Sequence, residues 1–249
     1  LKYGRFSRLT TGSAILEFNL NHEIRHARSL KKDWLNPQEW MKRTLGDDWV
    51  YYSTGGYAGV FEALGEYYLP NLTYETNSLL GGKPFSEPCI SNLRGGWYEI
   101  LSQINLKNTP DTVRNWFDYT LENTPGKNRQ KAERLIDIIG SRVSVLPPDA
   151  RHVDYNVIPV NICDGCLYKC RFCRVKNKNP FSIRKRAEIQ KQISDLTELS
   201  GKDLINYNAL FLGEHDSLNA PDDLILDTAS LAYNSFNFKH STMKGAYLF

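Results

Sequence analysis

The sequence predicts an α/β protein with two regions, a mixed α/β region over residues 1–148 and the beginning of an α/β barrel over residues 149–249. All five tryptophans lie in the first half of the chain and four of the five cysteines lie beyond residue 160, which indicates two regions with different roles. Between the regions, the consecutive prolines of segment 145–150 cannot continue a helix and favour an extended linker. Beyond this linker, strand, loop, helix and strand patterns follow one another, as in a βα unit.

The first region is expected to begin with a hairpin. A mostly apolar stretch at 14–18, a polar turn at 19–22 and the segment at 23–25 predict two paired strands. Residues 36–39 are typical of a helix start, because they contain a capping residue, then a proline at the first helical position and then an acid.

The rest of the first region is expected to alternate between strand and helix. A strand at 49–52 should turn through the glycines at 55–56 into a helix at 60–68. Two more helices are expected at 109–122 and 126–139. We find no motif in this region that predicts a chemical role.

The second region is expected to begin with a strand at 154–162, which is rich in β-branched residues and leads directly into a cysteine-rich loop. Catalytic groups of α/β barrels lie at the carboxyl ends of the strands, where this loop begins. Pro159 lacks a backbone donor and therefore fits an edge strand. Apolar residues then recur at helical spacing between 183 and 199, with Ser182 as the expected cap, and an apolar strand follows at 209–212.

Four cysteines, Cys163, Cys166, Cys170 and Cys173, lie close together in the loop. The last three form a C-x3-C-x2-C pattern, and three thiolates on a short loop can hold an iron-sulfur cluster with one iron open to a small molecule. Cys163 lies outside this pattern. We expect it to be a small buried residue at the end of a strand, with a substitute ligand as the alternative.

Other metal sites fit the cysteine spacing less well. A structural zinc site usually joins two C-x2-C pairs across a dozen or more residues, whereas three residues separate the pairs here, although a single Zn(Cys)4 site remains an alternative. A ferredoxin-like carrier would need a fourth ligand followed by proline, and Cys173 is followed by Arg174. A disulfide framework is typical of small secreted domains, so we expect reduced thiols and a cytoplasmic protein.

The C-x3-C-x2-C loop, with the aromatic Phe172 before its last cysteine, resembles the cluster loop of the radical S-adenosylmethionine (SAM) superfamily. The resemblance covers about residues 154–249 and implies a partial (β/α)6 barrel. It also implies that Cys166, Cys170 and Cys173 hold a [4Fe-4S] cluster, that SAM chelates the fourth iron, and that Phe172 packs near the adenine.

A second motif follows the strand at 209–212. The superfamily commonly ends this strand with Gly-Gly-Glu, which binds the SAM amino group, and here Gly213 and Glu214 stand in the matching place. The run from Phe211 to Leu218 is similar to the looser form in the group of the elongator catalytic subunit and coproporphyrinogen dehydrogenase. His215 and Asp216 are candidates to face the substrate.

The resemblance implies an enzyme that cleaves SAM reductively to a 5'-deoxyadenosyl radical, which takes hydrogen from a substrate. Its expected partners are a reduced flavodoxin or ferredoxin-type electron donor and a small-molecule substrate. The competing class is a non-catalytic iron-sulfur or zinc-binding module. No catalytic side chain is assigned by the sequence.

A basic tract extends from Lys169 to Lys191 and contains nine lysines and arginines against one acid, Glu188. It could screen the cluster and the SAM carboxylate, form a docking face for an acidic electron donor, or bind RNA as in tRNA-modifying relatives. The first two interpretations are simpler because the sequence contains no recognisable accessory RNA module. The net charge of +3 does not by itself indicate a nucleic-acid-binding protein.

The sequence has neither a run of about 18 apolar residues nor a signal-peptide pattern at its N-terminus, so no membrane partner is expected. A complete barrel needs about six βα units of ~30 residues each, and residues 157–249 suffice for about three. We therefore expect a fragment of a catalytic domain that ends in its third strand, at 246–249. An exposed strand edge would make such a fragment prone to aggregation.

Overall fold

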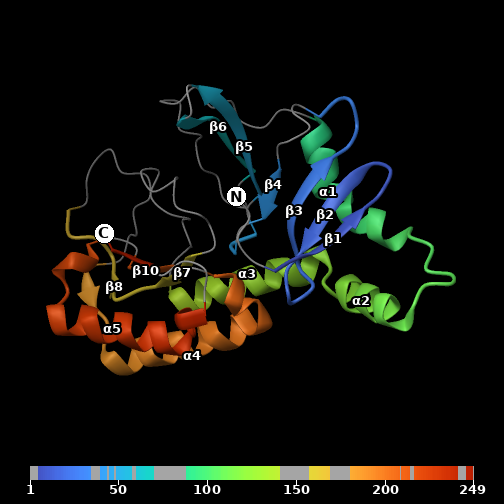
Figure 1. The fold of residues 1–249 in the computed structure, drawn as a ribbon. Helices are drawn as coiled ribbons and strands as arrows, with labels where there is room; N and C mark the ends of the chain where they lie inside the picture. The colour runs from blue at the N-terminus through green and yellow to red at the C-terminus, as the bar shows by residue number, and fades with distance from the viewer. Residues whose placement is uncertain are drawn as a thin grey trace. The chain divides into compact units, whose positions relative to one another are not determined.

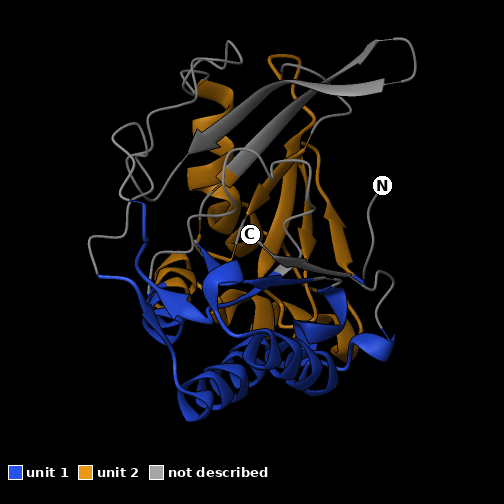
Figure 2. Ribbon diagram, turned by 90° about the vertical axis from the view of Figure 1, so that its left-hand side faces the viewer, with its two compact units in different colours: residues 1–5, 133–249 blue, residues 6–132 orange. Residues whose placement is uncertain are grey.

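The structure is a computed structural model, which describes residues 5–34, 40–43, 45–47, 49–57, 60–69, 88–140, 157–168, 180–207, 209–213, 216–240 and 245–248. Its mixed α/β chain divides into two compact units, residues 6–132 and residues 1–5 with 133–249 (Figure 2). This division lies N-terminal to the boundary expected at 148, because the end of helix α3 (Pro125–Ile139) belongs to the second unit. There, the side-chain amide of Asn161 donates a hydrogen bond to the carbonyl of Ile139 at 3.2 Å.

The unit of residues 6–132 contains a six-stranded antiparallel sheet whose strands pair in chain order (Figure 1). The strands are β1 (Ser7–Thr10), β2 (Ala14–Phe18), β3 (Ile24–Ser29), β4 (Met41–Arg43), β5 (Trp49–Tyr57) and β6 (Val60–Leu69). The predicted hairpin is therefore confirmed as β2 and β3, which pair with Leu16 opposite Ala27.

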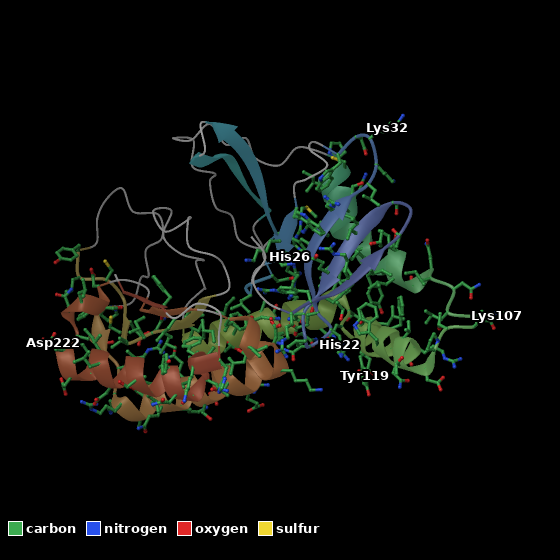
Figure 3. All side chains as sticks on the ribbon, in the orientation of Figure 1. His22, His26, Lys32, Lys107, Tyr119 and Asp222 are labelled. Carbon is green, nitrogen blue, oxygen red and sulfur yellow. The ribbon has the colours of Figure 1, made fainter. Side chains whose placement is uncertain are left out.

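Three helices follow the sheet: α1 (Pro88–Ser102), α2 (Asp111–Glu122) and α3. Helix α1 places Ile90, Leu93, Trp97 and Leu101 on one face, and these residues join Leu16 and Phe18 of β2 in a buried core. Burial of this apolar surface is the main force that holds the helices on the sheet. Close to the turn between β2 and β3, His22 stacks on Tyr119 of α2, with 5.4 Å between the ring centroids (Figure 3).

For the first region, one prediction is wrong, one lies outside the described residues and one helix was not predicted. Residues 60–68 form strand β6 rather than a helix, because they pair along their whole length with β5, and Gly55 and Gly56 lie within β5 instead of a turn. Residues 36–39 lie outside the described residues, but 41–43 form strand β4, so a helix from 36 does not continue there. Helix α1 was not predicted, whereas α2 and α3 were.

The other unit contains three parallel strands, β7 (Val157–Val160), β10 (Ala209–Leu212) and β11 (Gly245–Leu248), in the order β11-β10-β7. Helix α4 (Arg186–Ser200) connects β7 to β10, and α5 (Asp222–Ser235) connects β10 to β11. The edge position predicted for the strand of Pro159 is confirmed within this sheet. The predicted strand at 209–212 is also confirmed, and the strand expected at 246–249 is β11.

Helices α4 and α5 lie side by side on one face of the parallel sheet (Figure 1). A sequential order of three strands with both helices on one face fits the first units of an α/β barrel, and it also fits one half of a doubly wound sheet, whose two halves carry their helices on opposite faces. Among the described residues, the strands form open sheets.

Two details of this unit differ from expectation or add to it. Ser182 does not cap α4, because Ser182 and Ile183 form the short strand β9 (Ser182–Ile183), and the cap is Lys185 with Glu188 bonded back to its amide. Short 3-10 helices follow α4 (η3, Gly201–Asn206), β10 (η4, Ser217–Asn219) and α5 (η5, Phe238–His240). None of the described helices is long and apolar enough to cross a membrane.

Candidate functional site

The cysteine loop and the turn after β10 leave the same edge of the parallel sheet. Strands β7 and β10 are neighbours, with Val160 opposite Leu212, and the amide of Gly213 donates a hydrogen bond to the carbonyl of Val160 at 2.7 Å. Because the strands are parallel, the residues that follow both of them emerge at the carboxyl edge. The described first residues of the two motifs, Cys166 and Gly213, therefore follow neighbouring strands at one edge, although they are far apart in the chain.

Gly213 occupies a position that requires glycine. Its φ of 92° is rarely adopted by L side chains, and a Cβ built on it would lie 1.3 Å from the hydroxyl oxygen of Ser217. The turn after β10 is thus packed directly against η4. This close packing fixes the backbone at the position where the family resemblance implies a SAM contact.

The two ends of the cysteine loop are held together by a short antiparallel pair. Strand β8 (Cys163–Asp164) pairs with β9, placing Cys163 opposite Ile183. The amide of Arg184 also donates to the carbonyl of Ile162 at 2.9 Å. The loop between residues 164 and 182 is therefore closed at its base.

An ion pair reinforces this closure. The Arg184 guanidinium donates to both carboxylate oxygens of Asp164, at 2.9 Å from Nε and 2.5 Å from Nη2, and also to the carbonyl of Ile139 at the end of α3. The Arg184 side chain is only 11% exposed, so this fork is largely shielded from water. A two-pronged arginine-carboxylate contact has a defined geometry and therefore restricts how the loop base can move.

The strand end that leads to the loop is fixed by a buried amide. The side chain of Gln192 on α4 accepts a hydrogen bond from the Asn161 amide at 2.8 Å and donates to the Asn161 carbonyl at 3.0 Å. Both residues are buried. Gln192 thus supplies the hydrogen bonds that a neighbouring strand would otherwise supply to the backbone N–H and C=O of Asn161. These bonds stabilise the chain where β7 ends.

Asp216 connects the two motifs directly. It has a left-handed backbone with φ of 53°, and its carboxylate accepts a hydrogen bond from the amide of Leu167 at 2.8 Å. Leu167 follows Cys166 in the chain. Asp216 was a candidate to face the substrate, and in the structure its carboxylate holds the backbone of the cysteine loop.

The described cysteines have different environments. Cys163 is 1% exposed, and its thiol lies 3.9 Å from the Ser217 hydroxyl. Burial raises the pKa of Cys163 above its ordinary value, and Asp164 and Asp216 raise it further, against the Ser217 hydrogen bond and Arg184. A thiol that resists ionisation is a poor metal ligand, as expected for a structural residue. Cys166 is a half-buried free thiol.

The structure describes two of the predicted site residues, Cys166 and Gly213. The others lie outside the described residues: Cys170, Phe172, Cys173 and Glu214, together with His215. Within the part of the chain that the structure describes, no three His, Cys, Asp or Glu side chains are grouped so that they could hold a metal ion.

The basic tract is partly neutralised by acids from other segments. Besides the contact of Arg184 with Asp164, Arg186 pairs with Asp223 and Asp227 of α5. Lys191 pairs with Asp195 at 2.5 Å. The basic tract itself contains one acid, Glu188. Its sequence therefore overstated the positive charge that Arg184, Arg186 and Lys191 offer to a ligand.

Sequence reasoning missed the residues that hold the site together. Arg184 was noticed only for its charge, and Asp164, Gln192 and Ser217 were not singled out at all. Their roles depend on contacts between segments that lie far apart in the chain. A weak signal was present, because Asp216 and Ser217 come two and three residues after Glu214, and polar residues after a strand of a parallel sheet often line a site.

Comparison of the chain with protein-family models, with curated proteins and with solved structures gave no match.

Proposed function

We propose that this protein is a radical SAM enzyme. The observation that carries the proposal is the place of the C-x3-C-x2-C motif, which leaves the carboxyl end of β7 beside the glycine turn of the neighbouring strand β10. Two motifs that resemble one family by sequence thus begin at one edge of one sheet. If the similarity of the two segments to this family were due to chance, there would be no reason for them to begin at the same edge of the sheet.

The arrangement of the elements supports the same proposal. Sequential parallel strands with both helices on one face fit the first units of a partial (β/α)6 barrel. In such a barrel, the carboxyl edge of the strands holds the cofactors and the reacting part of the substrate. The cysteine loop starts at that edge.

The donor set and the loop base fit a [4Fe-4S] cluster. Cys166, Cys170 and Cys173 would be its ligands, since three thiolates leave one iron open and soft sulfur ligands favour iron-sulfur clusters. The Arg184-Asp164 fork and the β8-β9 pair hold the ends of the loop, and Asp216 holds the backbone next to Cys166. A loop that is already closed loses less conformational entropy when it binds its cluster.

A reduced cluster of this kind supplies the electron that cleaves bound SAM into methionine and a 5'-deoxyadenosyl radical. The contribution of the chain is to bind and orient SAM and to exclude water and oxygen. Gly213 and Glu214 would bind the SAM amino group, and Phe172 would pack against the adenine. The rigid backbone of Gly213 supports this role, because its packing on Ser217 leaves little freedom of movement.

The proposed partners are a reduced flavodoxin or ferredoxin-type electron donor and a small-molecule substrate. The ion pairs of Arg184, Arg186 and Lys191 weigh against RNA as the principal ligand of the basic tract, because charges already paired attract phosphate less strongly.

The decisive experiment is anaerobic reconstitution of the chain with iron and sulfide, followed by incubation with SAM and dithionite. We expect a brown protein that absorbs at about 400 nm and forms 5'-deoxyadenosine, detected by mass spectrometry. Cys166→Ala should form none. A colourless protein that holds stoichiometric zinc and never forms 5'-deoxyadenosine would contradict the proposal and favour a non-catalytic zinc-binding module.

A further inference from the structure

A second candidate site lies within residues 6–132, away from the cysteine motif in the sequence. A pocket of about 250 Å³ opens at the start of helix α3. Its wall contains Trp49 and Trp97, both buried, and the helix start at Pro125 and Gly126. All of its lining residues belong to this one compact unit.

The pocket is rich in positive charge. Arg43, Arg94 and Arg129 line it, with Asp47 as its one acid. Asp47 accepts a hydrogen bond from Arg43 at 2.5 Å, so this pair is internally neutralised. Arg94 is half-buried and has no hydrogen-bond or ion-pair partner within the described part of the chain. A half-buried, unpaired guanidinium leaves its donors available to an anion.

The helix start adds donors of the same kind. Helix α3 has 15 residues, and the partial positive charge of a helix N-terminus attracts anions. The hydroxyl of Thr124 accepts a hydrogen bond from the Lys127 amide at 3.2 Å. Pro125 has no amide proton to donate. The amide of Gly126 has no hydrogen-bond partner among the described residues, so it is available to a ligand in the pocket.

An unsatisfied side chain is an independent indication of a ligand. Asn128 lines the pocket and is 3% exposed, yet its amide nitrogen has no hydrogen-bond partner in the described structure. The backbone carbonyl of Asn128 is engaged separately, because it accepts a hydrogen bond from the Arg43 guanidinium at 3.4 Å. A buried donor without a partner costs about 1–3 kcal/mol. Such a donor is expected where a ligand completes the hydrogen bonding.

We propose that this pocket binds the phosphate group of a small ligand, either free phosphate or a phosphate monoester. A dianionic oxyanion suits a site that combines a helix start with unpaired arginine, and its oxygens can accept from Arg94, Gly126 and Asn128. The volume suits a small ligand better than a nucleic-acid strand, which would need an extended groove. This site is separate from the proposed SAM chemistry and gives the first region a binding role.

The test is an equilibrium titration of the full chain, at fixed ionic strength, with inorganic phosphate, adenosine 5'-monophosphate and adenosine. Trp49 and Trp97 line the pocket, so tryptophan fluorescence is a direct readout. We expect phosphate and the monophosphate to bind and adenosine not to bind. Tighter binding of the monophosphate would identify an ester as the ligand, and equal affinities would identify the free ion.

Three variants make the test specific. Arg94→Gln should weaken phosphate binding about tenfold, and Asp47→Asn should tighten it by about fivefold because Asp47 is the one acid among the described residues that line the pocket. The matched control is Arg114→Gln, which removes the same charge from an exposed position of α2 outside the pocket and should change nothing.

Two outcomes would overturn the proposal. One is an equal effect of Arg94→Gln and Arg114→Gln, which would show only attraction to surface charge. The other is binding of a single-stranded RNA without terminal phosphate that Arg94→Gln weakens, while phosphate and the monophosphate do not bind. That result would assign the pocket to an RNA backbone.

Discussion

At the scale of single residues, the packing of Gly213 against Ser217 gives the first prediction. Gly213→Ala should lower the free energy of unfolding by more than about 2 kcal/mol, because an alanine at positive φ is strained and its methyl would overlap Ser217. Gly95→Ala is the matched control. Gly95 is a helical glycine with no atom within 4 Å of an added Cβ, so this change should stabilise by about 0.5–1 kcal/mol.

Urea denaturation of the two variants and the unaltered chain measures both effects. If Gly213→Ala were as stable as the unaltered chain, the turn after β10 would differ from the one in this structure. Its part in the candidate site would then have to be withdrawn.

The four clustered cysteines give a second prediction at this scale. Cys166→Ala, Cys170→Ala and Cys173→Ala should each abolish iron retention after reconstitution, because two thiolates hold a cubane cluster poorly. Cys163→Ala should retain iron, since Cys163 is buried and its thiol faces Ser217. Iron and sulfide analysis after gel filtration distinguishes the variants. Loss of iron from Cys163→Ala equal to that of the other three would place Cys163 among the ligands.

At the scale of elements, the base of the cysteine loop depends on one arginine. Arg184→Met should lower the free energy of unfolding by about 1–3 kcal/mol, because it leaves Asp164 without its arginine partner and removes one of the two side-chain hydrogen bonds to the Ile139 carbonyl. It should also expose residues 165–181 to faster proteolysis, since the ends of the loop would lose their side-chain ion pair and keep only hydrogen bonds to the backbone. Limited proteolysis with mass-spectrometric mapping measures this effect.

Arg186→Met is the control for this change. Arg186 also makes two ion pairs, but its side chain is 50% exposed, and exposed ion pairs contribute less than about 1 kcal/mol. It should leave the cleavage rate of the loop unchanged. Equal cleavage rates for the two variants would mean that Arg184 does not hold the loop.

The same elements show how much of the fold was accessible from the sequence. Strands β2 and β10 were predicted because their apolar residues and flanking turns are local signals. A helix was predicted for the residues of strand β6, because the strand depends on pairing with β5 and no local pattern in the sequence reveals that pairing. Helix α1 was missed although its buried residues have helical spacing, because Gly95 and Gly96 interrupt the pattern.

At the scale of the whole molecule, the sequence contained the two motifs of the candidate site, whose chemistry stays a prediction, but not the contacts that hold the site together. The cysteine spacing and the Gly213-Glu214 motif are short and local, so the sequence revealed them. The contacts of Arg184 require segments near 139, 164 and 184 to converge, and that convergence follows only from the fold. Ion pairing to α5 likewise changed the apparent charge of the basic tract.

Glu23 contributes to the way in which the free energy of unfolding of the whole chain changes at acid pH. Burial raises the pKa of Glu23, but Lys131 and Arg43 outweigh burial and the net pKa lies below the ordinary value. A lowered pKa stabilises the fold above about pH 4.3, and this contribution is lost as the pH falls through the folded pKa. Glu23→Gln should therefore flatten the acid side of a plot of unfolding free energy against pH. An unchanged acid slope would contradict this assignment.

At alkaline pH, Cys163 should cause the free energy of unfolding to fall as the pH rises. Because burial raises the pKa of this thiol, the unfolded chain loses the proton first as the pH rises. The stabilising effect is complete below the unfolded pKa of about 8.5 and declines as the pH rises from there toward the folded value. Urea denaturation between pH 7 and pH 10 should show this decline, and Cys163→Ala should reduce its slope. Equal alkaline slopes for the unaltered chain and Cys163→Ala would show that the thiol of Cys163 ionises as readily in the folded protein as in the unfolded chain.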